Sequence, residues 1–174
     1  MLVTNRRRAV LLGPLGVAFL ALAASSVRLA LDAPSGSRMA DLNVYLGAVH
    51  AVQHGTPLYD YAAANGDLFT YPPFALLVFW PFAGLPLGFV QVLWTLATVA
   101  AAVAIAAALT RRAGIQGRQR AAIATLTAAL VLLHSAPLNS NLRLGQVSVF
   151  VILLGLLDAL DLVPRRFSGG LIGL

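Results

Sequence analysis

The sequence contains no cysteine, no lysine and no glutamate. The absence of cysteine excludes a disulfide framework, a thiol nucleophile and a zinc–thiolate site. Charged side chains are also scarce, at 10% of the residues, whereas 59% are hydrophobic and the mean hydropathy is +0.84. A soluble domain of 174 residues would have difficulty burying this much apolar surface in one core. The composition therefore predicts an all-α polytopic membrane protein.

All twelve basic residues are arginines, and the six aspartates leave a net charge of +6. Most of the arginines flank apolar runs and can lie together on one side of a membrane. These are Arg6, Arg7, Arg8, Arg111, Arg112, Arg118, Arg120, Arg165 and Arg166. The positive-inside rule makes that side cytoplasmic, so we expect a multi-pass protein of the cell (plasma) membrane with its N-terminus in the cytoplasm. A nucleic-acid partner is not expected, because a binding patch would not be divided among spans in this way.

The apolar runs predict a single membrane region over residues 1–174. In chain order, we expect span 1 at 9–31, an outer loop at 32–84 with an interfacial helix at 72–83, span 2 at 85–110, span 3 at 121–138, span 4 at 147–163 and the start of span 5 at 167–174. A cleaved signal peptide is the alternative to span 1, because Ala21-Leu22-Ala23 resembles a cleavage site. The further apolar runs downstream favour an uncleaved anchor.

Two of these segments are too short to cross a bilayer. We interpret Phe74–Ala83 as a re-entrant or interfacial helix on the outer face, because this choice places the arginines after span 2 in the cytoplasm. The last segment, Phe167–Leu174, stops after eight residues. We therefore expect the chain to be a fragment of a longer membrane protein or a truncated gene product.

Polar residues are concentrated in the first outer loop. The segment 41–73 contains three of the six acidic residues and two of the three histidines. Its pattern predicts a helix over 42–54, because a glycine and then a proline follow as a stop signal. Asn65-Gly66 predicts a turn. Asp41 then lies at the start of the predicted helix, where its carboxylate is the most interesting group of the loop.

Short motifs in this loop and beyond it follow one another in a fixed order. They are Asp41-Leu42-x-Val44-Tyr45, Gly55-x-Pro57-Leu58-Tyr59, Tyr71-Pro72-Pro73-Phe74, Pro81 and Pro86 followed by Trp94, and Gly145-Gln146-Val147. Together they resemble the N-terminal part of glycosyltransferase family 87, a family of bacterial GT-C fold enzymes. The resemblance extends from about Arg6 to Leu174. It implies the N-terminal portion of a GT-C type helical bundle with a structured first extracytoplasmic loop.

The resemblance also implies an activity. Family members transfer a hexose, typically mannose, from a polyprenyl-phosphate sugar to a glycolipid or glycan acceptor. The expected partners are therefore the lipid-linked donor, the acceptor and membrane lipids. Members of the family are much longer, so a fragment of this length is not expected to be active alone.

Asp41 matches the essential aspartate that GT-C enzymes carry in their first outer loop. Its carboxylate would take a proton from the acceptor hydroxyl as that hydroxyl attacks the anomeric carbon and polyprenyl phosphate leaves. Direct displacement would invert the anomeric centre and give an α-mannoside from a β-linked donor. The alternative is that Asp41 only caps the helix that follows it. The sequence has no Asp-x-Asp pair, so we expect no metal and no cofactor.

Six further residues are candidates for substrate binding: Tyr45, His54, Tyr59, Tyr71, Arg143 and Gln146. The tyrosines could stack on sugar or isoprenoid, or belong to an interfacial aromatic belt. His54 could contact the donor phosphate or the acceptor, or have a packing role, and its spacing from His50 is a weak metal pattern. Arg143 could bind the donor phosphate, or pair with an aspartate or a lipid headgroup. Gln146 could contact the sugar, or serve packing.

Two other classes of function stay open. A transporter or flippase subunit would place charged groups at mid-membrane depth, whereas this sequence places its acids in loops or at the ends of spans. A non-catalytic truncated membrane scaffold would be indifferent to the loss of Asp41.

Overall fold

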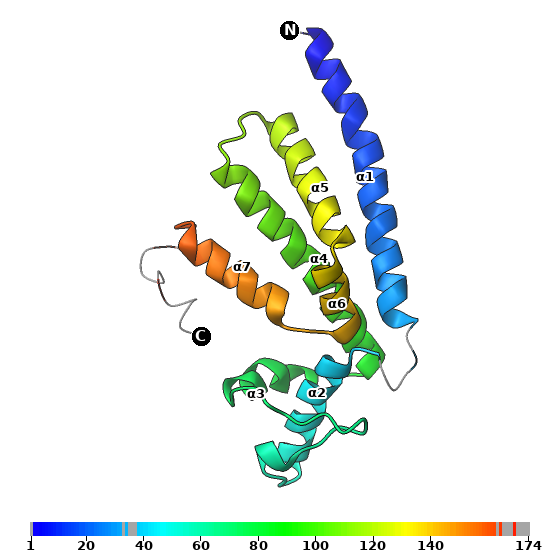
Figure 1. Cartoon of the computed structure of the whole chain (residues 1–174), viewed down its shortest axis with the longest axis vertical. Helices are drawn as coiled ribbons and strands as arrows, with labels where there is room; N and C mark the ends of the chain where they lie inside the picture. The colour runs from blue at the N-terminus through cyan, green and yellow to red at the C-terminus, as the bar shows by residue number, and fades with distance from the viewer. Residues whose placement is uncertain (1, 33, 35–37, 163, 165–168, 170–174) are drawn as a thin grey trace. The chain divides into compact units, whose positions relative to one another are not determined.

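The computed structural model describes residues 2–32, 34, 38–162, 164 and 169. In these residues the regular structure is helical, apart from one isolated bridge between Ala62 and Leu68 (Figure 1). The helices are α1 (Leu2–Leu31), α2 (Ala40–Gln53), the 3-10 helix η1 (Leu58–Asp60), α3 (Phe74–Phe79), the 3-10 helix η2 (Trp80–Phe82), α4 (Leu87–Arg112), α5 (Arg118–His134), α6 (Ala136–Leu144) and α7 (Ser148–Ala159).

Two of these helices are long and apolar enough to cross a membrane. They are α1, through its stretch Leu11–Arg28, and α4. A third span results if α5 and α6 are counted as one bent element, and α7 is a shorter apolar helix. The chain is thus an all-helical protein with candidate membrane spans, whereas the four-span topology stays a prediction. The expected start of span 5 at 167–174 lies outside the described residues except for Gly169.

The chain divides into two compact units. The first, here called the loop unit, consists of Val27–Leu96 and Leu142–Gln146. The second, here called the helical unit, consists of Met1–Ser26, Ala97–Asn141 and Val147–Leu174. The loop unit therefore combines the predicted outer loop with a short segment that follows it by about 50 residues.

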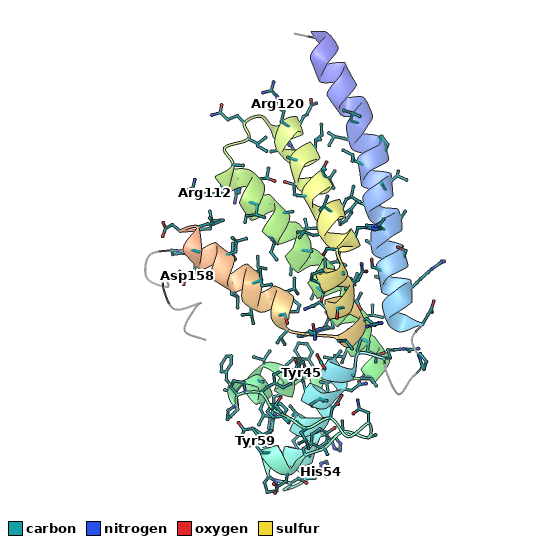
Figure 2. The ribbon with its side chains drawn as sticks, in the orientation of Figure 1. Tyr45, His54, Tyr59, Arg112, Arg120 and Asp158 are labelled. Atoms are coloured by element: carbon teal, nitrogen blue, oxygen red, sulfur yellow. The ribbon has the colours of Figure 1, made fainter. Side chains whose placement is uncertain are left out.

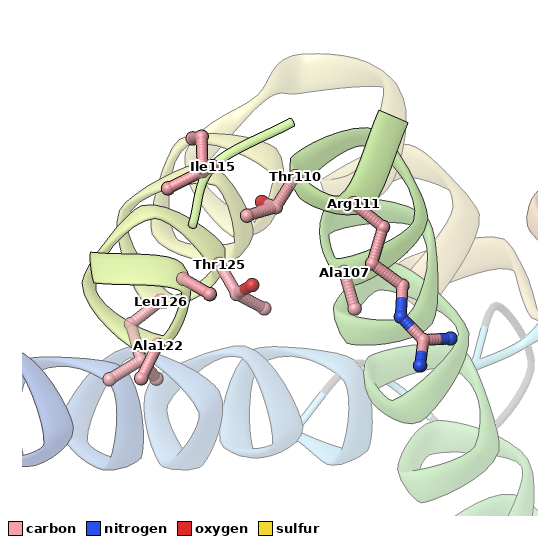
Figure 3. A pocket seen from close by; sticks show the side chains of 8 residues that line it. Ala107, Thr110, Arg111, Ile115, Ala122, Thr125 and Leu126 are labelled. Carbon is pink, nitrogen blue, oxygen red and sulfur yellow. The ribbon is translucent and has the colours of Figure 1, made fainter. Parts of the chain in front are cut away.

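In the helical unit, α4 turns back into α5 through the residues 113–117. Gly114 and Gly117 adopt φ values of 66° and 89°, which side chains other than glycine rarely accept. An open pocket of about 390 Å³ lies between the two helices near this turn. Thr110 of α4 and Thr125 of α5 lie in the space between them (Figure 3). The Thr110 hydroxyl donates a hydrogen bond to the carbonyl of Ala106 at 2.8 Å, so it is satisfied within its own helix.

The helix α5 ends where the predicted span 3 was expected to continue. Ser135 is extended, with ψ 143°, and the chain bends by 66° between α5 and α6. The residue at 137 is a proline, which cannot donate the backbone bond that would continue α5 but is well placed in the first turn of a new helix. The residues between the predicted spans 3 and 4 are therefore largely helical, because α6 extends to Leu144.

The last described helix, α7, carries a buried carboxylate near its end (Figure 2). Asp158 is 6% exposed, and both of its oxygens accept the backbone N–H of Gly169, at 2.8 and 2.9 Å. With 12 residues, α7 is about 18 Å long, which is shorter than the hydrocarbon core.

The core of the loop unit is aromatic. Tyr45 of α2 stacks on Phe79 of α3 with a centroid distance of 4.4 Å, and its edge meets Tyr71 at 4.6 Å. Phe79 in turn lies 5.2 Å from Trp94 of α4. Buried rings of this size remove on the order of 150–250 Å² each from water, so these contacts hold α2 against α3. The short helix α3 begins directly after two prolines, as expected for residues that lack an N–H to satisfy.

Candidate active site

The helix α2 begins from an unusual backbone conformation. Met39 precedes it with φ 49° and ψ 54°, in the left-handed region, and is completely buried. The Asn43 side chain donates to the carbonyl of Arg38 at 2.8 Å, which fixes the approach to the helix. Asp41 lies in the first turn, and the N-cap residue, Met39, makes no side-chain capping hydrogen bond. The alternative that Asp41 is the N-cap of this helix is therefore wrong, because Met39 occupies that position.

A second segment returns to this helix start from about a hundred residues downstream. The backbone N–H of Met39 donates to the carbonyl of Arg143 at 3.1 Å. Gly145 follows with φ 71° and packs so tightly that a Cβ atom there would lie 2.8 Å from the Leu42 Cβ. Because Gly145 has no side chain, the two segments pack closely there, and Gln146 follows it directly in the chain.

Burial raises the pKa of Asp41 above its ordinary value. A hydrogen bond from the Gln146 side chain opposes this shift by stabilising the carboxylate, and the negative charge of Asp67 raises the pKa further. The result is a half-buried carboxyl group whose protonated form is favoured more than in water. Such a group accepts protons more readily than an ordinary aspartate, which is a property of a general base.

Asp67 owes its position to a tight turn. Gly66 adopts φ 88°, and the N–H of Ala63 donates to the carbonyl of Asp67 at 2.8 Å. The Asn65 amide donates to the Asp67 carboxylate at 2.6 Å, and the Asp67 N–H donates to the Asn65 side-chain oxygen at 3.1 Å. The turn predicted at Asn65-Gly66 is confirmed. These contacts fix the Asp67 carboxylate within its own turn.

The sequence profile of glycosyltransferase family 87 matches residues 69–174. This chain belongs to that family. The match includes Gln146 and begins after Asp41.

Two relatives of this family 87 chain are named as polyprenol-phosphate-mannose-dependent alpha-(1-2)-phosphatidylinositol pentamannoside mannosyltransferases. The protein from Mycolicibacterium smegmatis is 37% identical over 146 residues, which cover 81% of this chain and 35% of the relative. The protein from Mycobacterium tuberculosis is 33% identical over 148 residues, which cover 80% of this chain and 33% of the relative. The chain thus spans about a third of the length of these relatives. No solved structure matches it.

The structure brings only some of the candidate residues of this family 87 chain together. Gln146 is close enough to Asp41 to lower the pKa of that carboxyl group, and the side chain of Arg143 is exposed. Tyr45 is 1% exposed and lies in the aromatic core, where its ring is covered by Tyr71 and Phe79. The ring of Tyr45 therefore packs α2 against its neighbours, and substrate could reach it only after a rearrangement.

His54 and Tyr59 lie toward the other end of α2 from Tyr45 (Figure 2). The helix rises by about 1.5 Å per residue, so the backbone of His54 is roughly 20 Å from that of Asp41. The His54 ring stacks on that of His50 at 4.3 Å, and its Nδ1 lies 2.7 Å from the His50 carbonyl. Tyr59 is 57% exposed, and its hydroxyl donates to the carbonyl of Tyr71 at 3.3 Å. The contacts of both side chains described here are thus with other residues of the loop unit, His50 and Tyr71.

Two residues of the site were not identified from the sequence as its parts: Met39 and Asp67. Asp67 could have been found from the sequence, because it directly follows the turn that Asn65-Gly66 predicts. Met39 had none, because methionine has no preference for a left-handed backbone. In the part of the chain that the structure describes, no three His, Cys, Asp or Glu side chains gather as ligands for a metal ion.

Proposed function

We propose that the protein containing these residues transfers mannose from polyprenyl-phosphate-mannose to a phosphatidylinositol-based glycolipid. The observation that carries this proposal is the half-buried Asp41, with its raised pKa, in a chain of glycosyltransferase family 87 whose relatives bear that activity in their names. The segment that holds Asp41 is the polar part of an otherwise apolar chain, which suits chemistry between two lipid-anchored substrates at a membrane surface.

In the proposed reaction, an acceptor hydroxyl attacks the anomeric carbon of the donor. The new bond forms between the acceptor oxygen and that carbon, while the bond from the carbon to the phosphate oxygen breaks. Polyprenyl phosphate leaves with the bonding electron pair, and the hydroxyl proton moves to the Asp41 carboxylate. One displacement inverts the anomeric centre, so a β-linked donor gives an α-linked product. Asp41 supports this role through its raised pKa, which brings it closer to the pH at which the enzyme works.

The identity of the donor can be tested directly. Membranes containing the full-length protein are supplied with radiolabelled mannose, either as polyprenyl-phosphate-mannose or as a nucleotide-linked mannose with polyprenyl-phosphate-mannose synthesis inhibited. We expect label in glycolipid from the lipid-linked donor only, because a site at the membrane surface reaches that donor laterally. Transfer from the nucleotide sugar under inhibition would contradict the proposal. Membranes without the protein provide the background.

We also propose that the predicted outer loop, residues 32–84, lies outside the membrane and that the turn between α4 and α5 lies in the cytoplasm. A cysteine placed at Gly114 would be the only thiol of the chain, since the sequence has none. It should be labelled by an impermeant maleimide only after the cells are opened, whereas a cysteine at exposed Asn65 should be labelled in intact cells. Labelling at position 114 from outside would reverse this topology. The arginines on both sides of the turn are the physical reason for the expected result.

A further inference from the structure

We infer that the pocket between α4 and α5 binds an anionic glycerophospholipid, with part of one acyl chain in the pocket and the phosphate group on the arginines beside it. The site lies wholly within the helical unit, whereas Asp41 belongs to the loop unit. The inference therefore does not depend on the proposed transfer of mannose. The sequence predicts membrane lipids only as general partners, and the structure indicates where one of them binds.

The pocket is formed where the chain reverses direction between two helices. Its volume of about 390 Å³ is in the range of pockets that hold small ligands. One wall, with Ala107 and Arg111, comes from the last two turns of α4, and the other, with Ala122 and Leu126, comes from the first turns of α5 (Figure 3). Ile115 contributes from the turn between the helices. The pocket thus lies at the level where the apolar helices end and the arginines begin.

The lining of the pocket suits a lipid chain. Apart from Arg111 and two threonines, it consists of alanine, leucine and isoleucine side chains. The hydroxyl of Thr110 donates to the carbonyl of Ala106 within α4, so it does not require a polar ligand. Ile115 is 39% exposed, although it follows a helix that is apolar enough to cross a membrane. Lipid tails are as apolar as leucine, so a tail can enter without leaving a polar group of the lining unsatisfied.

The charge beside the pocket is complementary to a phosphate group. Four exposed arginines lie within ten residues: Arg111, Arg112, Arg118 and Arg120. The sequence contains no acidic residue between Asp67 and Asp158. Among the residues that the structure describes, the side chains of these arginines form no ion pair. A guanidinium group can donate two parallel hydrogen bonds to a phosphate, so an anionic headgroup supplies the partner that the described chain does not.

The position of these arginines is unfavourable for α5 itself. The helix begins at Arg118, its first turn contains no acidic residue, and its N-cap residue, Gly117, makes no side-chain hydrogen bond. The N-terminus of a helix carries a partial positive charge, which repels arginine side chains. The positive-inside rule accounts for arginines on this side of the membrane but does not require an apolar pocket next to them. Basic pockets between membrane helices are typical of sites for anionic lipids.

The experiment uses the full-length protein in phosphatidylcholine nanodiscs. These contain a small fraction of phosphatidylglycerol with a diazirine on one acyl chain or, in a parallel sample, phosphatidylcholine with the same diazirine. After irradiation, mass spectrometry locates the labelled residues. We expect the phosphatidylglycerol probe to label the lining of the pocket at least about fivefold more than the phosphatidylcholine probe, from the attraction of even one arginine. Equal labelling by the two probes, or no labelling of the lining, would overturn the inference.

Two neighbouring arginines provide a matched pair for the charge. Arg111 lines the pocket, whereas Arg112 is equally exposed but does not. Arg111→Gln should lower labelling of the lining by phosphatidylglycerol about fivefold and leave labelling by phosphatidylcholine unchanged. Arg112→Gln should lower it by less than about twofold, because that charge is screened by solvent. Equal losses in the two variants would indicate a diffuse attraction of anionic lipids to this side of the protein, and the site would be wrong.

A second pair tests the place of the acyl chain. Ala122→Phe fills the pocket and should abolish labelling of its lining by both probes. Thr127→Phe adds the same ring to an exposed position of α5 outside the lining, and should have no effect. Labelling of the lining that persists in a folded Ala122→Phe variant would contradict the inference. If that variant does not fold, the two arginine variants still decide the outcome, because they change only exposed side chains.

Discussion

Replacement of Asp41 by asparagine is expected to lower mannose transfer by about 10²- to 10⁴-fold, the range that a general base contributes. Asparagine has nearly the same shape and can keep contact with Gln146, but its amide cannot accept the proton of the acceptor hydroxyl. The measurement is the transfer of radiolabelled mannose from polyprenyl-phosphate-mannose to endogenous lipid acceptors, in membranes with matched amounts of the full-length protein. Asp60→Asn is the control, because Asp60 is an exposed carboxylate of η1 in the same unit. Transfer retained in Asp41→Asn would remove the base assignment.

The same substitution should not weaken the fold, and pH dependence provides the check. The pKa of Asp41 is raised in the folded protein, so the stability linked to this group is present below its unfolded pKa and is lost as the pH rises through the folded pKa. Above that range, the ionised carboxylate is a cost that asparagine does not carry. We therefore expect the melting temperature of Asp41→Asn in detergent to equal or exceed that of the original protein at neutral pH. The difference should disappear in acid, whereas a lower value at neutral pH would mean that activity was lost through unfolding.

The second large effect is expected at Gly145. An alanine there must adopt φ 71°, and its Cβ would approach the Cβ atoms of both Leu42 and Met39. These atoms belong to the rigid start of α2 and cannot rotate away, so the two segments must separate. We expect a loss of about 2–4 kcal/mol in the free energy of unfolding, from the backbone strain and the overpacking together. Mannose transfer should fall at least about tenfold, because Gln146 moves away from Asp41.

A matched variant separates the two causes. Gly55 also has a positive φ, of 87°, but no atom lies within 4 Å of the position of its Cβ. Gly55→Ala should therefore cost only the strain, about 1 kcal/mol, and leave mannose transfer nearly unchanged. Thermal unfolding in detergent and the mannose assay measure both quantities. Equal effects of the two substitutions would mean that the contact between Gly145 and α2 has no special importance.

Local signals predicted much of the loop unit. The helix α2 covers the predicted range closely, because Gly55 stops it as the pattern indicates, and the turn at Asn65-Gly66 forms as expected. The helix after the two prolines is also present, as α3 and η2. All of these features depend on residues close together in the sequence, which is why a single sequence is sufficient to find them.

What the sequence did not predict depends on distant contacts. Met39 adopts a left-handed backbone where Arg143 accepts a hydrogen bond from its N–H and Gly145 packs beside it. The alternative that Asp41 caps α2 failed because the helix begins one residue earlier, at Ala40, with Met39 as its N-cap. The break at Ser135 was visible in principle through the proline that follows it. It was missed because the apolar run continues across the bend, and hydrophobicity alone does not register a change of direction.

The start of α2, which carries Asp41, packs against a segment about a hundred residues later in the chain. This part of the structure can therefore form only after that segment has been synthesised. At roughly 5–20 residues per second, a ribosome needs about 5–20 s to make the hundred or so residues between the two. During that interval the start of α2 lacks both the Arg143 carbonyl and the packing at Gly145, and Asp41 is without its amide donor. The surroundings of Asp41 are therefore completed late. A nascent chain that stalls within α5 already contains Asp41 but not the segment that packs beside it.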